Sequence, residues 1–355
     1  MERKSVLPSL LVLLGIACGG FSLVSSAQRE LPLPARVLIF YGVSCATFDS
    51  RTDAWTVALG TSGGQAEFLS LLDASATSTE TTGFALDVAG REGVVTALAF
   101  AGDGKTVACG FTESIVVWDV HDVPVSAGPV QTLSAGCGGS YVSSIALSPG
   151  LGGNLLASAR TYPIGCYYSG SSGVAVWDMN ASEYLGVQLD NITDAVSVAF
   201  SPDGKMLAAG LSDGRVLWWN ASSSSLEFRA AVPTPSEGRG NIVLFSPRGR
   251  RFFTASASGL ITSRSVDTPS QWVGRSEGAA LTALSVSPDG RVLAVGLSNG
   301  SLALLDSTTL DQQFFLPYAH CQDVIGLSFS ADGERLASVG AEGQVKVWRV
   351  LDLKS

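Results

Sequence analysis

Few side chains in this sequence have the identity and spacing of a known reaction centre. Only two histidines occur, His121 and His320, and no group of His and Cys has the spacing of a metal site. The sequence also has no Gly-Lys-Ser/Thr phosphate-binding loop and no Gly-x-Ser-x-Gly nucleophile elbow. It therefore predicts no metal, no cofactor and no catalytic residue.

Five Asp-Gly pairs are the remaining candidates for a chemical site, because their carboxylate oxygens could bind calcium. Each pair lies in a short turn and lacks the further carboxylates that an oxygen cage needs. Asp-Gly is also favoured in tight hairpin turns, because it supplies the positive φ angles that such a turn requires. We therefore interpret the pairs as hairpin turns, and they begin at Asp103, Asp203, Asp213, Asp289 and Asp332.

The turns belong to a unit that is clearest in residues 195–220. Val196, Val198 and Phe200 alternate with small or polar residues, which is the period of two expected for a strand. Two Asp-Gly turns then divide the remainder into a second and a third strand. A sheet of three such strands is barely stable alone, so the unit is expected to recur.

The unit recurs seven times. The apolar residue that ends the first strand of each copy is Phe48, Phe100, Leu147, Phe200, Phe245, Val286 or Phe329. The third strands end in Leu72-Asp73, Trp118-Asp119, Trp177-Asp178, Trp219-Asn220, Arg264-Ser265, Leu305-Asp306 and Trp348-Arg349. A repeat with a period of roughly 40 to 45 residues and a terminal Trp-Asp resembles the WD-repeat family, and the resemblance covers residues 35–355.

The resemblance implies an all-β fold, a seven-bladed β-propeller with four strands in each blade. Short apolar stretches supply the fourth strands of the first six blades, such as residues 184–189 and 226–232. Only residues 351–355 follow the third strand of the last blade, which is too few for a connection and a strand. We therefore predict that residues 35–41 complete the last blade, so that an N-terminal strand closes the ring and covers a sheet edge.

The last blade also contains His320, Ser338, Glu342 and Trp348. Their order resembles the buried hydrogen-bond set of His, Ser or Thr, Asp and Trp in WD repeats, with Glu342 where Asp is usual. Buried Trp and His side chains need partners for their polar atoms. The expected role of the four residues is therefore structural.

The N-terminus differs from the rest of the chain. Basic residues at positions 3 and 4 precede an apolar run over 6–24, and Ser25-Ser26-Ala27 offers a cleavage site. Residues 1–27 are predicted to be a signal peptide, or alternatively a membrane anchor, and residues 28–34 a linker. The expected location is secreted or periplasmic; the alternative is a membrane-anchored or lipidated protein with its propeller outside the cytoplasm.

The formal net charge of −9 argues against nucleic acid as a partner, because phosphate backbones are bound by basic surfaces. A membrane contact is expected only through the N-terminal segment, if that segment is uncleaved or lipidated. A protein or peptide therefore remains as the expected partner.

The expected binding site includes the one large insertion, residues 160–172 of the third blade. Tyrosines offer large contact area at low entropy cost, so this loop could anchor a ligand; its candidates are Tyr162, Ile164, Tyr167 and Tyr168. The connections on the same face could add a rim of Arg91, Glu92, Tyr141, Asp194, Arg239 and Asp323. The alternative is that these rings fold over the blade or fill the mouth of the channel.

Two cysteines of the third blade, Cys137 and Cys166, are expected in loops on one face of the propeller, where a disulfide could fix the insertion. The alternative is two free thiols. Cys45 and Cys109 lie on predicted inner strands and are expected to be small core residues.

Together these features predict an exported propeller that acts as a rigid scaffold for a protein or peptide and is not an enzyme. The alternative is a propeller-type enzyme that acts on a small molecule or a glycan at the central channel. Fold alone does not decide between the two functions.

Overall fold

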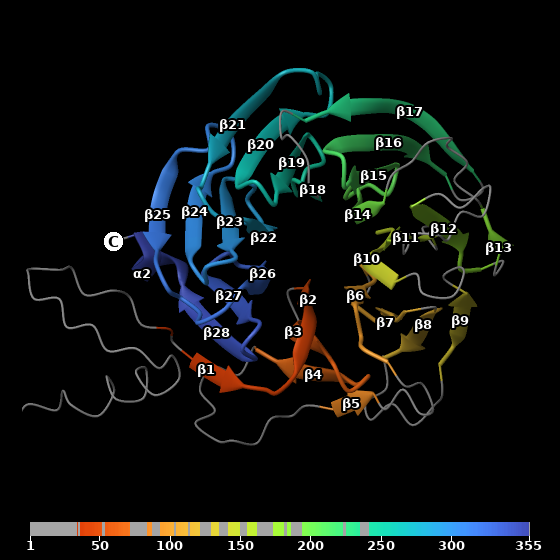
Figure 1. Ribbon diagram of the computed structural model, residues 1–355, viewed down its shortest axis with the longest axis horizontal. Coiled ribbons are helices and arrows are strands. Elements are labelled where there is room, and N and C mark those ends of the chain that lie inside the picture. The colour runs from red at the N-terminus through yellow and green to blue at the C-terminus, as the bar shows by residue number, and fades with distance from the viewer. Residues whose placement is uncertain are drawn as a thin grey trace, which may run out of the picture. The chain divides into compact units, whose positions relative to one another are not determined.

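The computed structural model describes residues 34, 36–51, 54–71, 84–86, 93–102, 104–112, 114–120, 129–134, 141–149, 155–161, 173–180, 183–185, 194–222, 225–234 and 241–354. Pro34–Ser355 form a compact unit in which seven four-stranded antiparallel sheets surround a central channel (Figure 1). The predicted seven-bladed propeller is confirmed. The predicted signal segment 1–27 lies outside the described residues, and so does the predicted linker, Pro34 excepted.

The first four blades follow the chain in order from the channel outward. Blade 1 contains β2 (Val43–Arg51), β3 (Ala54–Thr61), β4 (Ala66–Ser70) and β5 (Phe84–Leu86). Blade 2 contains β6 (Ala97–Phe100), β7 (Thr106–Gly110), β8 (Ser114–Asp119) and β9 (Gln131–Ser134). Blade 3 contains β10 (Tyr141–Leu147), β11 (Leu155–Thr161), β12 (Val174–Asp178) and β13 (Glu183–Tyr184). Blade 4 contains β14 (Ala195–Phe200), β15 (Met206–Leu211), β16 (Arg215–Ala221) and β17 (Leu226–Pro233).

The last three blades include the closure of the ring. Blade 5 contains β18 (Asn241–Phe245), β19 (Arg251–Ser256), β20 (Leu260–Ser265) and β21 (Trp272–Ser276). Blade 6 contains β22 (Leu281–Val286), β23 (Val292–Leu297), β24 (Leu302–Asp306) and β25 (Gln312–Leu316). Blade 7 contains β26 (Val324–Phe329), β27 (Arg335–Gly340), β28 (Gln344–Arg349) and β1 (Arg36–Ile39), and the short helix α2 (Val350–Lys354) follows it.

The N-terminal strand closes the ring as predicted. β1 pairs antiparallel with β28, from Arg36 opposite Val347 to Ile39 opposite Gln344. The strand is shorter than the predicted 35–41. It ends at Ile39, before the chain turns toward blade 1. The turn contains Gly42, whose φ of 66° suits a residue without a side chain.

The antiparallel order of each blade creates two faces at opposite ends of the strands. We call one the hairpin face; it carries the turns between the first and second strands and between the third and fourth. We call the other the connection face; it carries the turns between the second and third strands and the connections from blade to blade. The two faces define where separate ligands could bind.

The core lies between neighbouring blades, because successive side chains of a strand point to opposite sides of its sheet. In blade 4, Trp219 packs toward blade 3 in a buried cluster, whereas Trp218 packs edge-on against Phe245 and Phe252 of blade 5. The central strands are therefore apolar on both faces, as in β23, where every residue is buried. Each such large side chain stabilises the fold by about 1.5–3 kcal/mol.

The two cysteines expected in the core lie in one cluster between blades 1 and 2. Cys109 is fully buried, Cys45 is largely covered, and both are free thiols. Burial raises the pKa of Cys45 to about 12. Both side chains therefore behave as small apolar residues.

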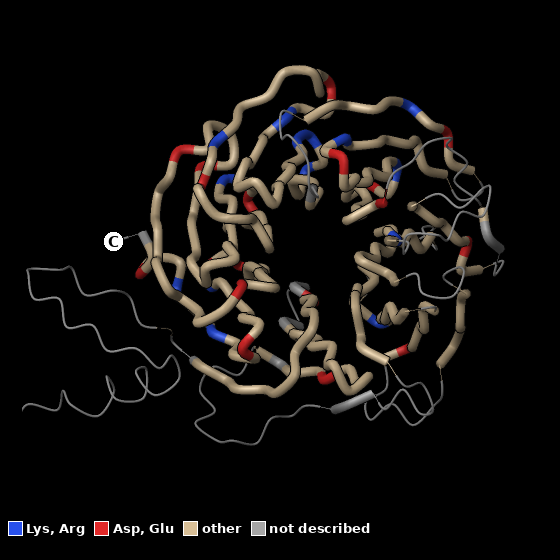
Figure 2. Tube along the Cα trace, viewed as in Figure 1, with Lys and Arg blue, Asp and Glu red and all other residues tan. Residues whose placement is uncertain are grey.

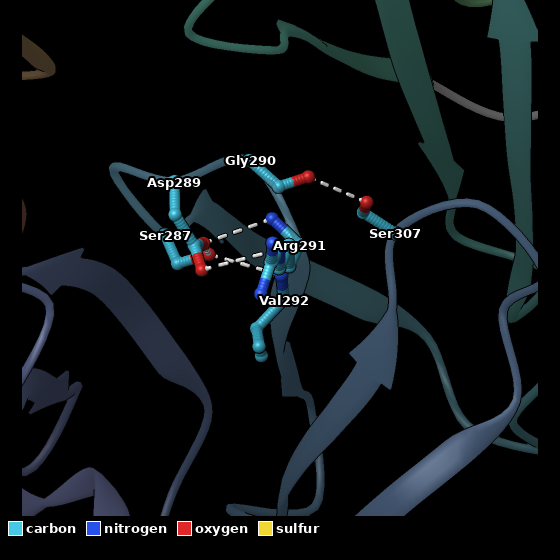
Figure 3. A network of polar contacts seen from close by, with 6 residues as sticks. All are labelled: Ser287, Asp289, Gly290, Arg291, Val292 and Ser307. Carbon is cyan, nitrogen blue, oxygen red and sulfur yellow. Dashed lines mark hydrogen bonds and ion pairs between the residues drawn. The ribbon is translucent and has the colours of Figure 1, made fainter.

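The hairpin interpretation of the Asp-Gly pairs is confirmed at three hairpin-face turns, of which Figure 3 shows that of blade 6. The Ser287 hydroxyl donates to Asp289 Oδ1 at 2.5 Å, and that carboxylate accepts the Arg291 N–H at 3.0 Å. Ser287 Oγ accepts the Val292 N–H at 2.9 Å. Equivalent contacts join Ser201 to Asp203 and Ser330 to Asp332, and these hydrogen bonds lower the pKa of Asp203 and Asp332.

The insertion of blade 3 is shorter than the predicted 160–172. Arg160 and Thr161 belong to β11, opposite Val142 and Tyr141, and Arg160 is buried. Pairing with β10 extends β11 over these two residues. The sequence does not indicate this pairing, because both residues read as part of a loop.

The C-terminus adds one helix to the expected all-β fold. The chain forms α2, whose Leu353 is buried in the cluster between blades 6 and 7. Within the described residues, no helix has the length and apolar character needed to cross a membrane.

Candidate functional site

The connection face presents three exposed tyrosines among the described residues. Tyr41, between β1 and β2, is 89% exposed, and Tyr318, between β25 and β26, is 84% exposed. These two connections leave and enter blade 7, so they are neighbours on the ring. Tyr141, at the start of β10, is less exposed and belongs to blade 3. Exposed tyrosines on a rigid frame are suited to binding rather than to packing.

Tyr318 adopts a backbone conformation that is rare for a bulky residue, with φ of 55°. Its N–H donates to Ser301 Oγ at 3.4 Å. The loop is fixed by a close backbone approach, since a Cβ on Gly300 would lie 2.0 Å from the carbonyl oxygen of His320. Strain of this kind costs on the order of 1–3 kcal/mol and concentrates at binding sites.

The predicted polar rim is placed only in part. Asp323 is exposed in the connection that enters blade 7, and its carbonyl accepts the Ala341 N–H at 2.8 Å. Asp194 is half-buried before blade 4, where its carbonyl accepts the Ser212 N–H at 2.8 Å. Together with Tyr141 these residues share the connection face. Tyr141 and Asp194 lie at the adjacent blades 3 and 4, whereas Asp323 lies at blade 7, so the three form no single cluster.

The remaining predicted binding residues lie outside the described residues, namely Arg91, Glu92, Tyr162, Ile164, Tyr167, Tyr168 and Arg239. The predicted disulfide partners Cys137 and Cys166 lie outside them too, as does His121. Sequence analysis missed Tyr41 and Tyr318. Their signal is weak, since each is a single ring in a short connection, beside Gly42 or after Pro317.

The structure brings the four residues of the blade 7 set together. His320 Nε2 lies 2.7 Å from Ser338 Oγ, which accepts the Trp348 Nε1–H at 2.9 Å. His320 Nδ1 lies 2.6 Å from Glu342 Oε1. Since Ser338 accepts from Trp348, its own proton is donated to Nε2, and the neutral ring donates through Nδ1 to the carboxylate. These three hydrogen bonds are all satisfied with His320 uncharged, whereas the second carboxylate oxygen, Glu342 Oε2, is buried without a partner.

Burial lowers the pKa of His320, although Glu342 opposes this shift. Burial is the largest single influence on Glu342 and would raise its pKa, but the hydrogen bond from His320, the charges of His320 and Lys346 and a backbone hydrogen bond together outweigh burial, so the net shift of the pKa is downward. Lys346 is buried beside them, burial lowers its pKa, and its ammonium donates to the Ala319 carbonyl at 2.6 Å. His320 is only 1% exposed, so the set holds the blade together and does not face a ligand.

The position of Ser338 lies on the second strand, two residues after the residue opposite Trp348; blades 3 and 5 keep a hydroxyl there, whereas blades 1, 2, 4 and 6 do not. The equivalent residues are Leu59, Cys109, Ser158, Ala209, Thr254 and Val295. In blade 5, Arg264 takes the place of Trp and is fully buried, donating to Thr262, Pro269 and Pro233.

The central channel contains a cavity of about 360 Å³ between the inner strands of blades 1, 5, 6 and 7. Its wall is of mixed polarity and includes Phe48, Leu284 and Ile325 beside Thr47, Thr282 and Ser285. No residue of this lining is titratable. The described wall therefore supplies no general acid or base for proton transfer.

The family described as "WD domain, G-beta repeat" matches residues 86–119, 187–220 and 312–349. The third match spans the fourth strand of blade 6 and the first three strands of blade 7. Similar curated proteins include protein groucho of Drosophila melanogaster, 25% identical over 72% of this chain and 33% of the relative. The guanine nucleotide-binding protein subunit beta-1 of Nicotiana tabacum is 27% identical over 70% of this chain and 68% of the relative. This chain thus spans about a third of the length of groucho.

Solved structures share the fold. A chain of the mitotic checkpoint complex superposes with a TM-score of 0.70 at 19% identity, over 93% of this chain and 99% of its own. The β-propeller domain of Cps50 (Swd1) from Myceliophteria thermophila gives 0.71 at 14% identity, over 90% and 99%.

Proposed function

Since this chain is a seven-bladed β-propeller of WD repeats, we propose that it is a rigid scaffold that binds a protein or peptide on its connection face. WD-repeat propellers typically mediate protein interactions. The observation that carries the proposal is the pair of highly exposed tyrosines, Tyr41 and Tyr318, on the two connections that flank blade 7.

A site that is already ordered before its ligand arrives avoids part of the entropy cost of binding. Tyr318 is already held with positive φ, by a loop that packs against Gly300. A residue whose backbone is fixed in advance loses less conformational freedom on binding, so more of its contact energy appears as affinity. Asp323 on the same connection could orient a ligand by accepting hydrogen bonds.

The loop of blade 3 stays part of the proposal on sequence grounds. Tyr162, Ile164, Tyr167 and Tyr168 would extend the site from the side of Tyr141. The alternative, an enzyme at the central channel, is not proposed. Its described cavity wall carries no titratable side chain, and general acid–base catalysis needs one.

A finer part of the proposal is that the chain is exported. Its support is the basic start, the apolar run over 6–24 and the small residues before Gln28. Export would also permit a disulfide between Cys137 and Cys166. We expect the intact mass of the protein purified from expressing cells to begin at Gln28. A mass that retains residues 1–27 would favour an anchor.

Binding should depend on the two connection-face tyrosines. We expect peptides selected by the full chain from a random library to bind the double variant Tyr41→Ala/Tyr318→Ala at least tenfold more weakly, because rigid aromatic anchors dominate such interfaces at about 1–2 kcal/mol each. The thermal midpoint should not fall, since both rings are exposed and Tyr318 carries strain. Fluorescence anisotropy measures the first quantity and a thermal melt the second.

A matched control is Phe228→Ala, which removes an exposed ring from the outer strand β17. It should leave the affinity unchanged. If the control weakens binding as much as the double variant does, or if the double variant binds like the unmodified chain, the ligand binds another surface. A parallel Tyr167→Ala/Tyr168→Ala variant tests whether the blade 3 loop belongs to the site.

A further inference from the structure

Blade 5 differs in charge from the rest of the chain. Its residues, 241–276, contain five Arg and one Asp, a net charge of 5 − 1 = +4, whereas the whole chain carries −9. Two of these arginines are used inside the blade: Arg264 is buried, and Arg251 donates to Ser263 Oγ at 3.0 Å. Arg275 forms an ion pair with Glu277. Arg248 and Arg250 remain, and both are exposed on the hairpin face.

Arg248 occupies the position that an aspartate holds in the corresponding turns of blades 4, 6 and 7. In those turns the carboxylate accepts a hydroxyl proton and a backbone N–H. An arginine has no acceptor, so of the side-chain hydrogen bonds of these turns blade 5 keeps only that from the Arg251 N–H to Ser246 Oγ, at 3.1 Å. The turn thus loses a stabilising contact and presents a cation instead. Such departures from a local rule are typical of functional sites.

The turns of blades 4, 5 and 6 lie side by side on this face. A Cβ on Gly249 would lie 3.5 Å from Pro202 Cδ of blade 4, and one on Gly290 of blade 6 would lie 3.8 Å from Pro247 Cδ. Figure 2 shows Lys and Arg positions gathered around blade 5. The three turns together carry four exposed cations, which we call the cationic patch: Lys205, Arg248, Arg250 and Arg291.

Two aspartates lie within the patch, but both are engaged in their own turns. Asp203 accepts from Ser201 and the Lys205 N–H, and Asp289 accepts from Ser287 and the Arg291 N–H. Asp289 also lies 3.9 Å from the Arg291 guanidinium, whose side chain is 85% exposed. Arg248 and Arg250 form no ion pair with any residue that the structure describes.

We propose that the cationic patch binds an acidic segment of a partner, a short stretch rich in Asp and Glu. Arginine matches a carboxylate with two parallel hydrogen bonds, and four cations over three adjacent turns suit several carboxylates in succession. Nucleic acid is the less suitable anion, because its continuous phosphates need a broader basic surface than four cations on three turns. The patch lies on the opposite face from Tyr41 and Tyr318, so it is a second site, independent of the proposed ligand of the connection face.

The test uses the full chain and a fluorescein-labelled oligoglutamate as the probe, with anisotropy read at low and at raised NaCl. We expect binding at low salt that weakens as salt screens the charges. Arg248→Asp should weaken binding about tenfold, as expected when a charge reverses within a complementary patch. This variant restores the aspartate found in the neighbouring turns, so its thermal midpoint should equal or exceed that of the unmodified chain.

The matched control is Arg349→Asp, which changes the net charge equally at an exposed position of blade 7, outside the patch. It should change the affinity less than twofold. The proposal is overturned if the two variants weaken binding equally, if oligoglutamate does not bind at low salt, or if a DNA duplex of similar length binds more tightly than the acidic peptide.

Discussion

Deletion of Arg36–Ile39 is expected to lower the free energy of unfolding by roughly 2–5 kcal/mol and to cause aggregation. The deletion removes the pairing of β1 with β28 and the half-buried Leu38, which packs on the cluster between blades 7 and 1. It also exposes the edge of β28, whose unpaired backbone groups can pair with another chain. Urea titration followed by tryptophan fluorescence measures the loss, and light scattering measures the aggregation.

The two faces of β1 provide a control. Val37 and Ile39 are 44% and 63% exposed, whereas Leu38 contacts the core. Leu38→Ala should therefore be destabilising, and Val37→Ala with Ile39→Ala should shift the midpoint little. An unchanged midpoint after the deletion would show that β1 contributes nothing to closure. Fewer side chains of this strand are buried than an apolar sequence suggests, so most of the effect comes from the backbone pairing.

Strands that face the core are predictable from the sequence, because burial on both faces imposes an apolar pattern. The three strands of residues 195–220 appear as β14, β15 and β16, with their turns where Asp-Gly lies. Outer strands carry less of this pattern since they face solvent. In blade 3 the apolar stretch 184–189 predicts a longer strand than β13, and in blade 4 β17 extends one residue beyond the predicted 226–232.

Of the candidate sites, the hydrogen-bond set of blade 7 depends on spacing within one sheet, which the register of β27 with β28 preserves. The exposed tyrosines depend on backbone details. Tyr318 has a positive φ, and no residue type indicates that angle. The role of Arg248 is apparent only from the Ser–Asp hydrogen bonds of the neighbouring turns, because Arg248 stands where those turns have the accepting aspartate.

Ser338→Ala is expected to be strongly destabilising for a substitution that removes one oxygen atom. Ser338 is fully buried, donates to His320 Nε2 and accepts from Trp348 Nε1. The variant leaves His320 Nε2 and Trp348 Nε1 buried without a partner, at about 1–3 kcal/mol each, so the free energy of unfolding should fall by roughly 2–4 kcal/mol. Urea titration at pH 7.5 measures this loss. This pH is about one unit above the ordinary pKa of histidine, so His320 is neutral in the folded and the unfolded chain.

The pH dependence follows from the lowered pKa of His320. The unfolded chain takes up a proton at this residue as the pH falls through about 6.5, whereas the folded chain does not until a lower pH. The unfolded state then binds more protons, so this contribution to stability is complete above pH 6.5 and decreases as the pH falls from there toward the folded pKa. In His320→Asn the slope of stability against pH in this window should be smaller.

Blade 3 supplies the control for the serine. Ser158 is equivalent to Ser338 and equally buried, yet its hydroxyl has no hydrogen-bond partner. Removal of an unsatisfied buried hydroxyl relieves a desolvation cost, so Ser158→Ala should be neutral or stabilising. A loss in Ser158→Ala equal to that in Ser338→Ala would mean that the cavity, and not the bonds to His320 and Trp348, sets the cost. Opposite effects at equivalent positions would assign the energy of blade 7 to the completed network.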